Sequence, residues 1–241
     1  MQPTFVFDSP QLGENIGAAA RGMRNFGLDR MRLVSPRDGW PNPKAFAAAS
    51  GAGMVLANAG IFDDLETALG EFQRVYATTA RRRELTKQVM TPKAAMVEAR
   101  ELMKRGVSVA VLFGSERAGL ENKSISFASA VISVPAIPEF SSLNLAQCAL
   151  LVGYEWRLSE EIAVEPVAIS EVDEANVLEK AALADKYAEA LKETGFFDTA
   201  QNEEGKRINL RNLFLRHDFT VSEVKTLHGI RRFLSVRRHR T

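Results

Sequence analysis

Cysteine and histidine are scarce in this 241-residue sequence, and their scarcity excludes several kinds of site. A single cysteine, Cys148, rules out a disulfide framework and a cysteine-based zinc site, and its apolar neighbours favour a place in the core. The three histidines, His217, His228 and His239, all follow residue 216. A general acid or base before that point must therefore be Arg, Lys, Glu, Asp or Tyr, or else the substrate must be activated by positioning.

Long apolar runs and common nucleotide motifs are also missing. No segment reaches about 18 uninterrupted apolar residues, and residues 1–8 lack the basic start and apolar run of a signal peptide. There is no Walker A sequence, no Gly-x-Gly-x-x-Gly turn and no His-Glu-x-x-His. We expect a cytoplasmic protein without membrane insertion, and we do not expect nucleotide hydrolysis, ordinary dinucleotide binding or zinc-dependent hydrolysis.

Positive charge is concentrated at one end of the chain. Residues 206–241 hold 10 Lys/Arg and 2 Asp/Glu, whereas residues 1–205 hold 21 Lys/Arg and 28 Asp/Glu. A phosphate-rich partner would explain this concentration. A solvated helix face with a disordered end would explain it equally well.

Apolar strand-like runs alternate with helical segments over the first 158 residues, which predicts an α/β fold with a mostly parallel sheet covered on both faces. Thr91 and Pro92 form a good helix start, because threonine can cap a helix and proline suits its first position. The expected strands are 4–8, 30–34, 74–78, 107–113 and 130–134, and the expected helices lie near 15–26, 43–50, 64–71, 92–105 and 143–158.

The remainder of the chain reads as a linker followed by helices. Residues 160–204 are acidic, and apolar residues recur from Val177 to Leu191 at helical spacing. Thr220 and Glu223 fit a capping box that starts a last helix, with Phe219 and Val224 as its hydrophobic staple. We predict a domain over 1–160, a linker over 161–172 and a small basic helical extension over 173–241.

Two polar loops are placed where a pocket is expected. The segment 113–120, Phe-Gly-Ser-Glu-Arg-Ala-Gly-Leu, follows a buried-looking strand, and 141–145, Ser-Ser-Leu-Asn-Leu, opens a helix. Open α/β sheets bind ligands at the carboxyl ends of their strands, so the loops predict two walls of one pocket. Gly114 and Gly119 allow close backbone approach, and Glu116 can accept backbone N–H bonds, although an ordinary glycine turn has the same composition.

Three segments together resemble the motifs of one enzyme family. Residues 15–21, 112–120 and 134–145 are similar, in order and spacing, to the three motifs of SPOUT-class RNA 2′-O-methyltransferases of the TrmH-like group. The resemblance covers about residues 1–158, and the basic carboxyl-terminal helices resemble those of the TrmJ branch, which acts on the tRNA anticodon loop.

The resemblance implies a fold and a chemistry. The sheet would carry the deep trefoil knot of the class, an exception to the general avoidance of knots. The methyl donor would be S-adenosylmethionine, no metal would be needed, and the enzyme would be a homodimer with its active site between subunits. The helix 143–158, through Leu150, Leu151, Tyr154 and Trp156, would supply the interface, although core burial explains the same residues.

Roles for individual residues follow from the same resemblance. Arginine is a reluctant base, so we expect Arg21 to lower the pKa of the attacking 2′-hydroxyl and to fix its geometry; a solvated arginine is the plain alternative. Ser142 and Asn144 would offer donors to ribose or phosphate oxygens, but they also suit helix caps. The residues expected to take part in catalysis are Arg21, Asn15, Ser142 and Asn144. The residues expected to bind the cofactor are Thr78, Thr79, Ala80, Gly114, Glu116, Gly119, Val134, Pro135, Ile137, Ser141, Ser142 and Leu143. The residues expected to bind RNA are Arg81, Arg83, Arg117, Arg231 and Arg232.

The function expected from the sequence is methylation of a ribose 2′-hydroxyl in tRNA with S-adenosylmethionine, at nucleotide 32 of the anticodon loop. Two alternatives stay open at this point. One is the same chemistry on ribosomal RNA or on another tRNA position, because the catalytic motifs are shared across targets. The other is a non-catalytic RNA-binding protein with the same fold.

Overall fold

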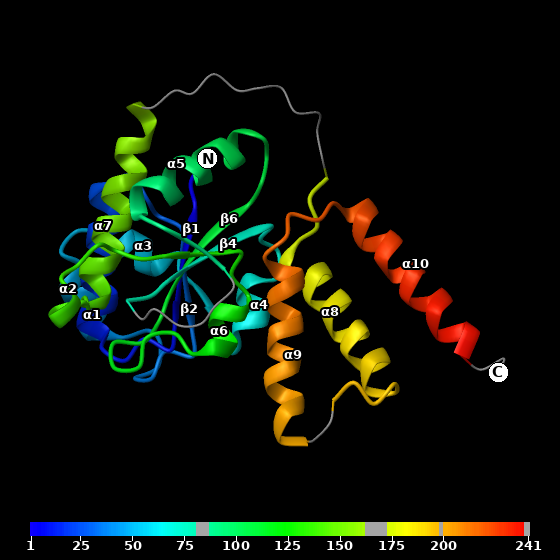
Figure 1. Cartoon of the computed structure of the whole chain (residues 1–241). Coiled ribbons are helices and arrows are strands. Elements are labelled where there is room, and N and C mark those ends of the chain that lie inside the picture. The colour runs from blue at the N-terminus through cyan, green and yellow to red at the C-terminus, as the bar shows by residue number, and fades with distance from the viewer. Residues whose placement is uncertain (81–86, 162–172, 198–199, 239–241) are drawn as a thin grey trace.

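A parallel β-sheet forms the centre of the protein in the computed structural model, which describes residues 1–80, 87–161, 173–197 and 200–238 (Figure 1). Within these residues the sheet has seven strands in the order β3-β2-β1-β6-β4-β7-β5, and every neighbouring pair is parallel. All carboxyl ends therefore lie at one edge. The strands are β1 (Thr4–Asp8), β2 (Met31–Val34), β3 (Gly60–Phe62), β4 (Arg74–Thr78), β5 (Gln88–Met90), β6 (Val109–Phe113) and β7 (Ala130–Ile132).

The central strands are apolar on both faces, as strands covered on both sides must be. Phe5 and Phe7 of β1 pack against Phe113 of β6, with ring centroids 4.9 and 5.0 Å apart. The predicted α/β fold is confirmed, and β1 and β4 have the expected bounds. Two strands, β3 and β5, were not predicted. Each is a three-residue strand at an edge of the sheet and is too short to give a recognisable apolar pattern in the sequence.

In the part of the chain that the structure describes, five helices cover one face of the sheet and share one core with it. The closest approach is between α1 and α2: a Cβ atom on Gly17 would lie 2.1 Å from the carbonyl oxygen of Ala45, so only glycine fits there. Thr91 caps α5 by accepting from the N–H of Ala94 (3.2 Å), as predicted. The helices are α1 (Gly13–Asn25), α2 (Pro43–Ala49), α3 (Gly53–Ala57), α5 (Pro92–Lys104) and α7 (Leu145–Leu158), which ends in the 3-10 turn η2 (Ser159–Glu161).

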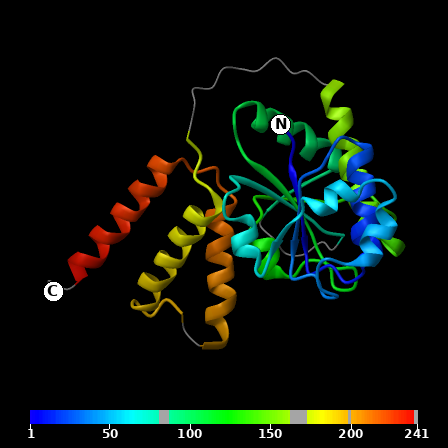
Figure 2. The same ribbon diagram turned by 180° about the vertical axis from the view of Figure 1, so that it is seen from behind.

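The carboxyl-terminal helices help to cover the opposite face. Val177 of α8 (Val177–Lys192) and Leu215 of α9 (Ala200–Leu215) are buried in the same core as Leu112 of β6, beside α4 (Leu65–Leu69) and α6 (Asn122–Ser126). The N–H of Val177 also donates to the carbonyl of Phe72 (2.9 Å). Figures 1 and 2 show α8 and α9 side by side against this flank of the sheet.

The last helix, α10 (Val221–Arg238), extends away from the body of the molecule (Figures 1 and 2). Its predicted capping box is confirmed: Thr220 accepts from the N–H of Glu223 (3.0 Å), and Glu223 accepts from the N–H of Thr220 (2.7 Å). Phe219 and Val224 join a small apolar cluster formed by α8, α9 and the start of α10. The extension thus has a core of its own.

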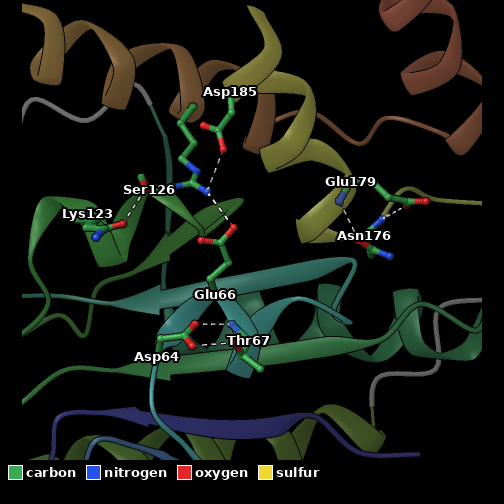
Figure 3. Close-up of polar contacts among 9 residues, drawn as sticks. Asp64, Glu66, Thr67, Lys123, Ser126, Asn176, Glu179 and Asp185 are labelled. Carbon is green, nitrogen blue, oxygen red and sulfur yellow. Dashed lines mark hydrogen bonds and ion pairs between the residues drawn. The ribbon is translucent and has the colours of Figure 1, made fainter. Parts of the chain in front are cut away.

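Arginine side chains form ion pairs that connect the extension to the sheet domain. Arg74, only 8% exposed at its side chain, pairs with Glu98 of α5 and with Asp218 (2.8 Å), which lies between α9 and α10. Arg211 of α9 reaches Glu66 of α4 (3.5 Å) and Asp185 of α8 (3.8 Å), two residues that face each other in Figure 3. Its guanidinium also stacks 4.6 Å from the ring centroid of Phe127.

Some predictions about organisation are not tested by the fold. The proposed linker, residues 161–172, lies outside the described residues apart from Glu161. The domain boundaries and the trefoil knot therefore stay predictions.

Candidate active site

A cavity of about 240 Å³ opens at the carboxyl edge of the sheet, where β6, β4 and β7 end side by side. The polar loops predicted to form two walls of one pocket both contribute to it. Its lining residues are Thr78, Thr79, Ala80, Phe113, Gly114, Ser115, Glu116, Arg117, Ala118, Gly119, Leu120, Ile132, Val134, Ser141, Ser142, Leu143, Leu145 and Cys148.

Most of the predicted cofactor residues line this cavity, but two do not. Pro135 and Ile137 lie outside it, and both are exposed, Ile137 by 66%. Sequence reasoning missed the apolar floor: Ile132 and Leu145 look like core residues, and only their place at a strand end or a helix start marks them as pocket lining. Arg117, predicted to bind RNA, lines the same cavity.

The loop after β6 is closed by its own backbone. The N–H of Gly119 donates to the carbonyl of Ser115 (2.9 Å), and Gly119 has a φ of +67°, a conformation that favours glycine. A Cβ atom on Gly114 would lie 2.2 Å from the carbonyl carbon of Gly119. Both glycines are therefore required to shape the loop itself, and their predicted close approach to a cofactor stays a prediction.

Glu116 connects this loop to the start of α1. Its carboxylate accepts from the N–H groups of Gln11 (2.7 Å) and Leu12 (3.1 Å) and from the side-chain amide of Asn15 (2.9 Å). Leu12, the N-cap of α1, has no capping side chain of its own, so the carboxylate of Glu116 takes that role from a distant part of the sequence. The expectation that Glu116 accepts backbone N–H bonds is confirmed, but the donors belong to the segment before α1.

Asn144 connects α7 to the same network. Its side-chain oxygen accepts from the N–H groups of Ala146 (2.9 Å) and Gln147 (3.3 Å), which confirms the helix-cap interpretation. Its amide group donates to the side-chain oxygen of Asn15 (3.0 Å). Because α7 begins at Leu145, two residues later than expected, Ser142 lies before the helix, exposed at the rim of the cavity.

Arg21 lies on the exposed side of α1, opposite the predicted apolar face formed by Ile16, Ala19, Ala20 and Met23. Among the described residues no hydrogen bond or ion pair holds its guanidinium. It is not part of the cavity lining. Its charge is thus available to a ligand that arrives from solvent.

Cys148 and Thr78 form the inner wall of the cavity. Burial raises the pKa of the Cys148 thiol to about 11, so the group is a neutral thiol near pH 7. The hydroxyl of Thr78 donates to the carbonyl of Leu112 (3.0 Å) and so joins β4 to β6 beside the cavity. Cys148 packs against the core, as expected, and also reaches the cavity.

The predicted RNA-binding arginines are not all brought together. Arg81 and Arg83 lie outside the described residues. Arg231 and Arg232 lie on α10, and Arg232 is exposed. Among the described residues, no group of three or more His, Cys, Asp or Glu is placed to hold a metal. In the same part of the chain no helix combines the length and the apolarity that crossing a membrane requires.

Comparisons with known proteins agree with the three motifs. Residues 2–154 match the SpoU rRNA Methylase family. The tRNA (cytidine/uridine/adenosine-2′-O-)-methyltransferase TrmJ of Pseudomonas aeruginosa is 33% identical over 225 residues, which are 90% of this chain and 87% of that protein. The tRNA (cytidine/uridine-2′-O-)-methyltransferase TrmJ of Pectobacterium atrosepticum is 32% identical over 219 residues, 90% of this chain and 89% of that one.

A solved structure extends the similarity to the whole fold. The crystal structure of TrmJ from Z. mobilis ZM4 has a TM-score of 0.86 and 41% sequence identity, and the match covers 97% of this chain and 99% of that chain. The predicted similarity to the TrmJ branch is thereby confirmed. Since the family match spans more than half of the sequence, the chain belongs to the SpoU rRNA methylase family.

Proposed function

We propose that the protein transfers the methyl group of S-adenosylmethionine to a ribose 2′-hydroxyl of tRNA, at nucleotide 32, as a cytoplasmic homodimer. The observation that carries this proposal is the hydrogen-bonded series Glu116, Asn15, Asn144. It joins the first motif to the second and third motifs, which lie 101 and 129 positions away in the sequence, and Glu116 of this series lines the cavity.

The cavity lining suits the proposed cofactor. Ile132, Val134 and Leu145 offer an apolar surface for a flat heteroaromatic ring, and the loop 114–120 offers backbone groups that can read its edge. The hydroxyls of Ser141 and Ser142 suit ribose or amino-acid oxygens. When bound, S-adenosylmethionine would supply an electrophilic methyl group.

The residues around the rim suit an approaching ribose. Asn15 is fixed from both sides, by Glu116 and by Asn144, so its position is set before any ligand arrives. Ser142 is exposed at the rim and can donate to a ribose or phosphate oxygen. The guanidinium of Arg21 would hold a phosphate or favour the ionised 2′-hydroxyl, with the proton leaving through phosphate or water.

Two observations support tRNA as the acceptor. The similar proteins of P. aeruginosa and P. atrosepticum are named as tRNA methyltransferases, and the similarity includes the extension. Residues 206–241 of the extension hold 10 Lys/Arg and 2 Asp/Glu, and Arg74 and Arg211 hold the extension against the sheet domain. Cations at a fixed place relative to the cavity can position a folded RNA through its phosphates.

The exposed side of α7 supports the proposed dimer. Leu150, Leu151 and Tyr154 are 38%, 37% and 45% exposed, which is unusual for neighbouring large apolar residues and typical of an interface. Trp156 was grouped with them in the sequence, but it is 4% exposed and stacks under the guanidinium of Arg100 at 3.8 Å. It belongs to the core and not to the interface.

Calorimetry and a methyl-transfer assay test the proposal together. We expect S-adenosylmethionine to bind, and unmodified tRNA to accept its methyl group while ribosomal RNA does not. Transfer to ribosomal RNA alone would replace the tRNA assignment. An absence of cofactor binding at millimolar concentration would leave a non-catalytic RNA-binding protein.

A further inference from the structure

Phe140 is held out into solvent beside the cavity. It ends the 3-10 turn η1 (Pro138–Phe140), and its side chain is 77% exposed. The next three residues, 141–143, all line the cavity. An aromatic ring in this place is unusual, because phenylalanine side chains are mostly buried in folded proteins.

The local backbone keeps this ring from collapsing onto the core. Pro135 and Pro138 restrict the chain on the approach to the turn, since proline fixes φ. The N–H of Phe140 then donates to the carbonyl of Ile137 (3.1 Å), which closes the turn. Among the described residues, no apolar cluster and no ring contact includes Phe140. The ring is thus presented outward on a fixed support.

The position of the ring matches that of a base attached to the reacting ribose. Ser142 follows Phe140 by two residues and Asn144 by four, and consecutive Cα atoms are about 3.8 Å apart. A ribose placed against Ser142 and Asn144 would carry its base within reach of Phe140. Single-stranded RNA bases commonly stack on such exposed rings, since every base has a flat face.

We propose that Phe140 is the platform on which the base of the target nucleotide stacks, and that it thereby positions the ribose for methyl transfer. This inference rests on the proposed function and adds a residue to it. Stacking reads the face of a base and not its hydrogen-bonding edge. The platform therefore does not distinguish one base from another, and the choice of nucleotide position is made elsewhere on the RNA.

Three substitutions separate stacking from other roles. Phe140→Ala removes the ring, Phe140→Leu keeps apolar bulk without a π-face, and Phe140→Tyr keeps the ring. Since stacking on an aromatic residue is worth about 5- to 150-fold in affinity, we expect the Ala and Leu variants to raise KM for full-length tRNA at least fivefold. The Tyr variant should stay within about twofold of the wild type, by the same reasoning. Affinity for S-adenosylmethionine should be unchanged in all three.

A fluorescent base gives a direct readout. The probe is tRNA with 2-aminopurine riboside at the target nucleotide. We expect its fluorescence to be quenched on binding to the wild-type protein and to the Tyr variant, and not on binding to the Leu variant. Phe196→Leu changes another exposed phenylalanine, 53% exposed and outside the cavity lining, and should behave as the wild type.

Two results would overturn the inference. If the Leu variant quenched the fluorescent probe as the wild type does and had the wild-type KM for tRNA, the π-face of Phe140 would not be used. Conversion of a dimer into monomers by Phe140→Ala, measured by analytical ultracentrifugation, would assign the ring to an interface between copies of the chain. If the wild-type protein methylates no RNA, the proposed function fails, and the quenching of the probe still tests the stacking by itself.

Discussion

The side-chain amide of Asn144 donates to the side-chain oxygen of Asn15 across 3.0 Å, and this contact joins the N-cap of α7 to the first turn of α1. The same Asn144 caps α7, so one residue has a structural and a positioning role. Substitution can separate the two roles.

Asn144→Ala should lower both stability and activity. The loss of the cap costs about 1 kcal/mol of stability, and the loss of the amide releases Asn15. Asn144→Asp keeps the oxygen that caps the helix and removes the donor, so we expect near wild-type thermal stability with strongly reduced methyl transfer. Thermal unfolding and turnover on tRNA, measured on both variants, check this. Full activity in the Asp variant would remove any positioning role from the contact.

Glu116→Gln tests the carboxylate that caps α1 from outside. The amide has one acceptor oxygen in place of two, so at least one of the N–H groups of Gln11 and Leu12 loses its partner. An unsatisfied donor of this kind costs about 1–3 kcal/mol, which a urea denaturation curve can measure. Glu14→Gln changes an exposed carboxylate of the same helix, and its effect should stay within about 0.5 kcal/mol. Equal effects in the two variants would contradict the capping role of Glu116.

Gly114→Ala should close or distort the loop after β6. The added methyl group would overlap the backbone of Gly119, which cannot move aside without breaking the turn. We expect the variant to lose affinity for S-adenosylmethionine by at least tenfold in calorimetry. Gly205→Ala is the matched control, because its Cβ meets no atom within 4 Å and it lies inside α9. That change should leave cofactor affinity unchanged and stabilise the protein by about 0.5–1 kcal/mol.

Lys87 should make stability depend on pH. Burial, with a smaller contribution from the charge of Arg216, lowers the pKa of this lysine to about 7, and its ammonium group donates to the carbonyls of Ser126 and Ala128. In the unfolded chain its pKa is about 10.4, so between pH 7 and pH 10 the unfolded state binds more protons. The free energy of unfolding should therefore rise over this range, by up to about 1.4 kcal/mol per pH unit from this group.

Lys87→Met removes that contribution. The variant loses two hydrogen bonds and should be less stable overall, and its unfolding free energy should rise less between pH 7 and pH 10 than that of the wild type. Lys104→Met, at an exposed lysine, should keep the wild-type slope. Denaturation curves at several pH values give the unfolding free energy of each protein as a function of pH. Equal slopes of unfolding free energy against pH in the wild type and in the Lys87 variant would show that this lysine does not titrate between pH 7 and pH 10.

Arg231→Gln combined with Arg232→Gln tests the basic extension without removing it. Deleting the extension is a poor test, because Val177 and Leu215 are buried against the sheet. If both arginines contact phosphates, affinity for tRNA should fall and the slope of log K against log salt should decrease by about 2. Binding of tRNA at several salt concentrations measures this, and unchanged slopes would assign the two arginines to a solvated helix face.

The sequence was sufficient for the parts of the fold that carry strong local signals. The apolar strands β1, β4 and β6, the helix start at Thr91 and the capping box at Thr220 are each specified by neighbouring residues. Helix α9 was not predicted, since its two large buried residues, Phe214 and Leu215, are adjacent and come only at its end.

The candidate site was predictable in its residues but not in its connections. The polar loops after β6 and before α7 were recognisable because their residues match known motifs. The donors to Glu116 lie about a hundred positions away, and nothing local in either segment indicates the pairing. Ile132 and Cys148 lie in apolar stretches of sequence that are typical of the core. Only the three-dimensional fold shows that they line the cavity at the end of the sheet.

The most direct test of the proposed function is the mapping of the methylated nucleotide after reaction of unmodified tRNA with labelled S-adenosylmethionine, for the wild-type protein and for Arg21→Ala. We predict a 2′-O-methyl group at nucleotide 32 with the wild type. The variant should give none, while its affinity for the cofactor is retained. Equal methylation by the two proteins would show that Arg21 is a solvated arginine without a role in methyl transfer. A wild-type protein that methylates no tRNA ribose would contradict the proposed function.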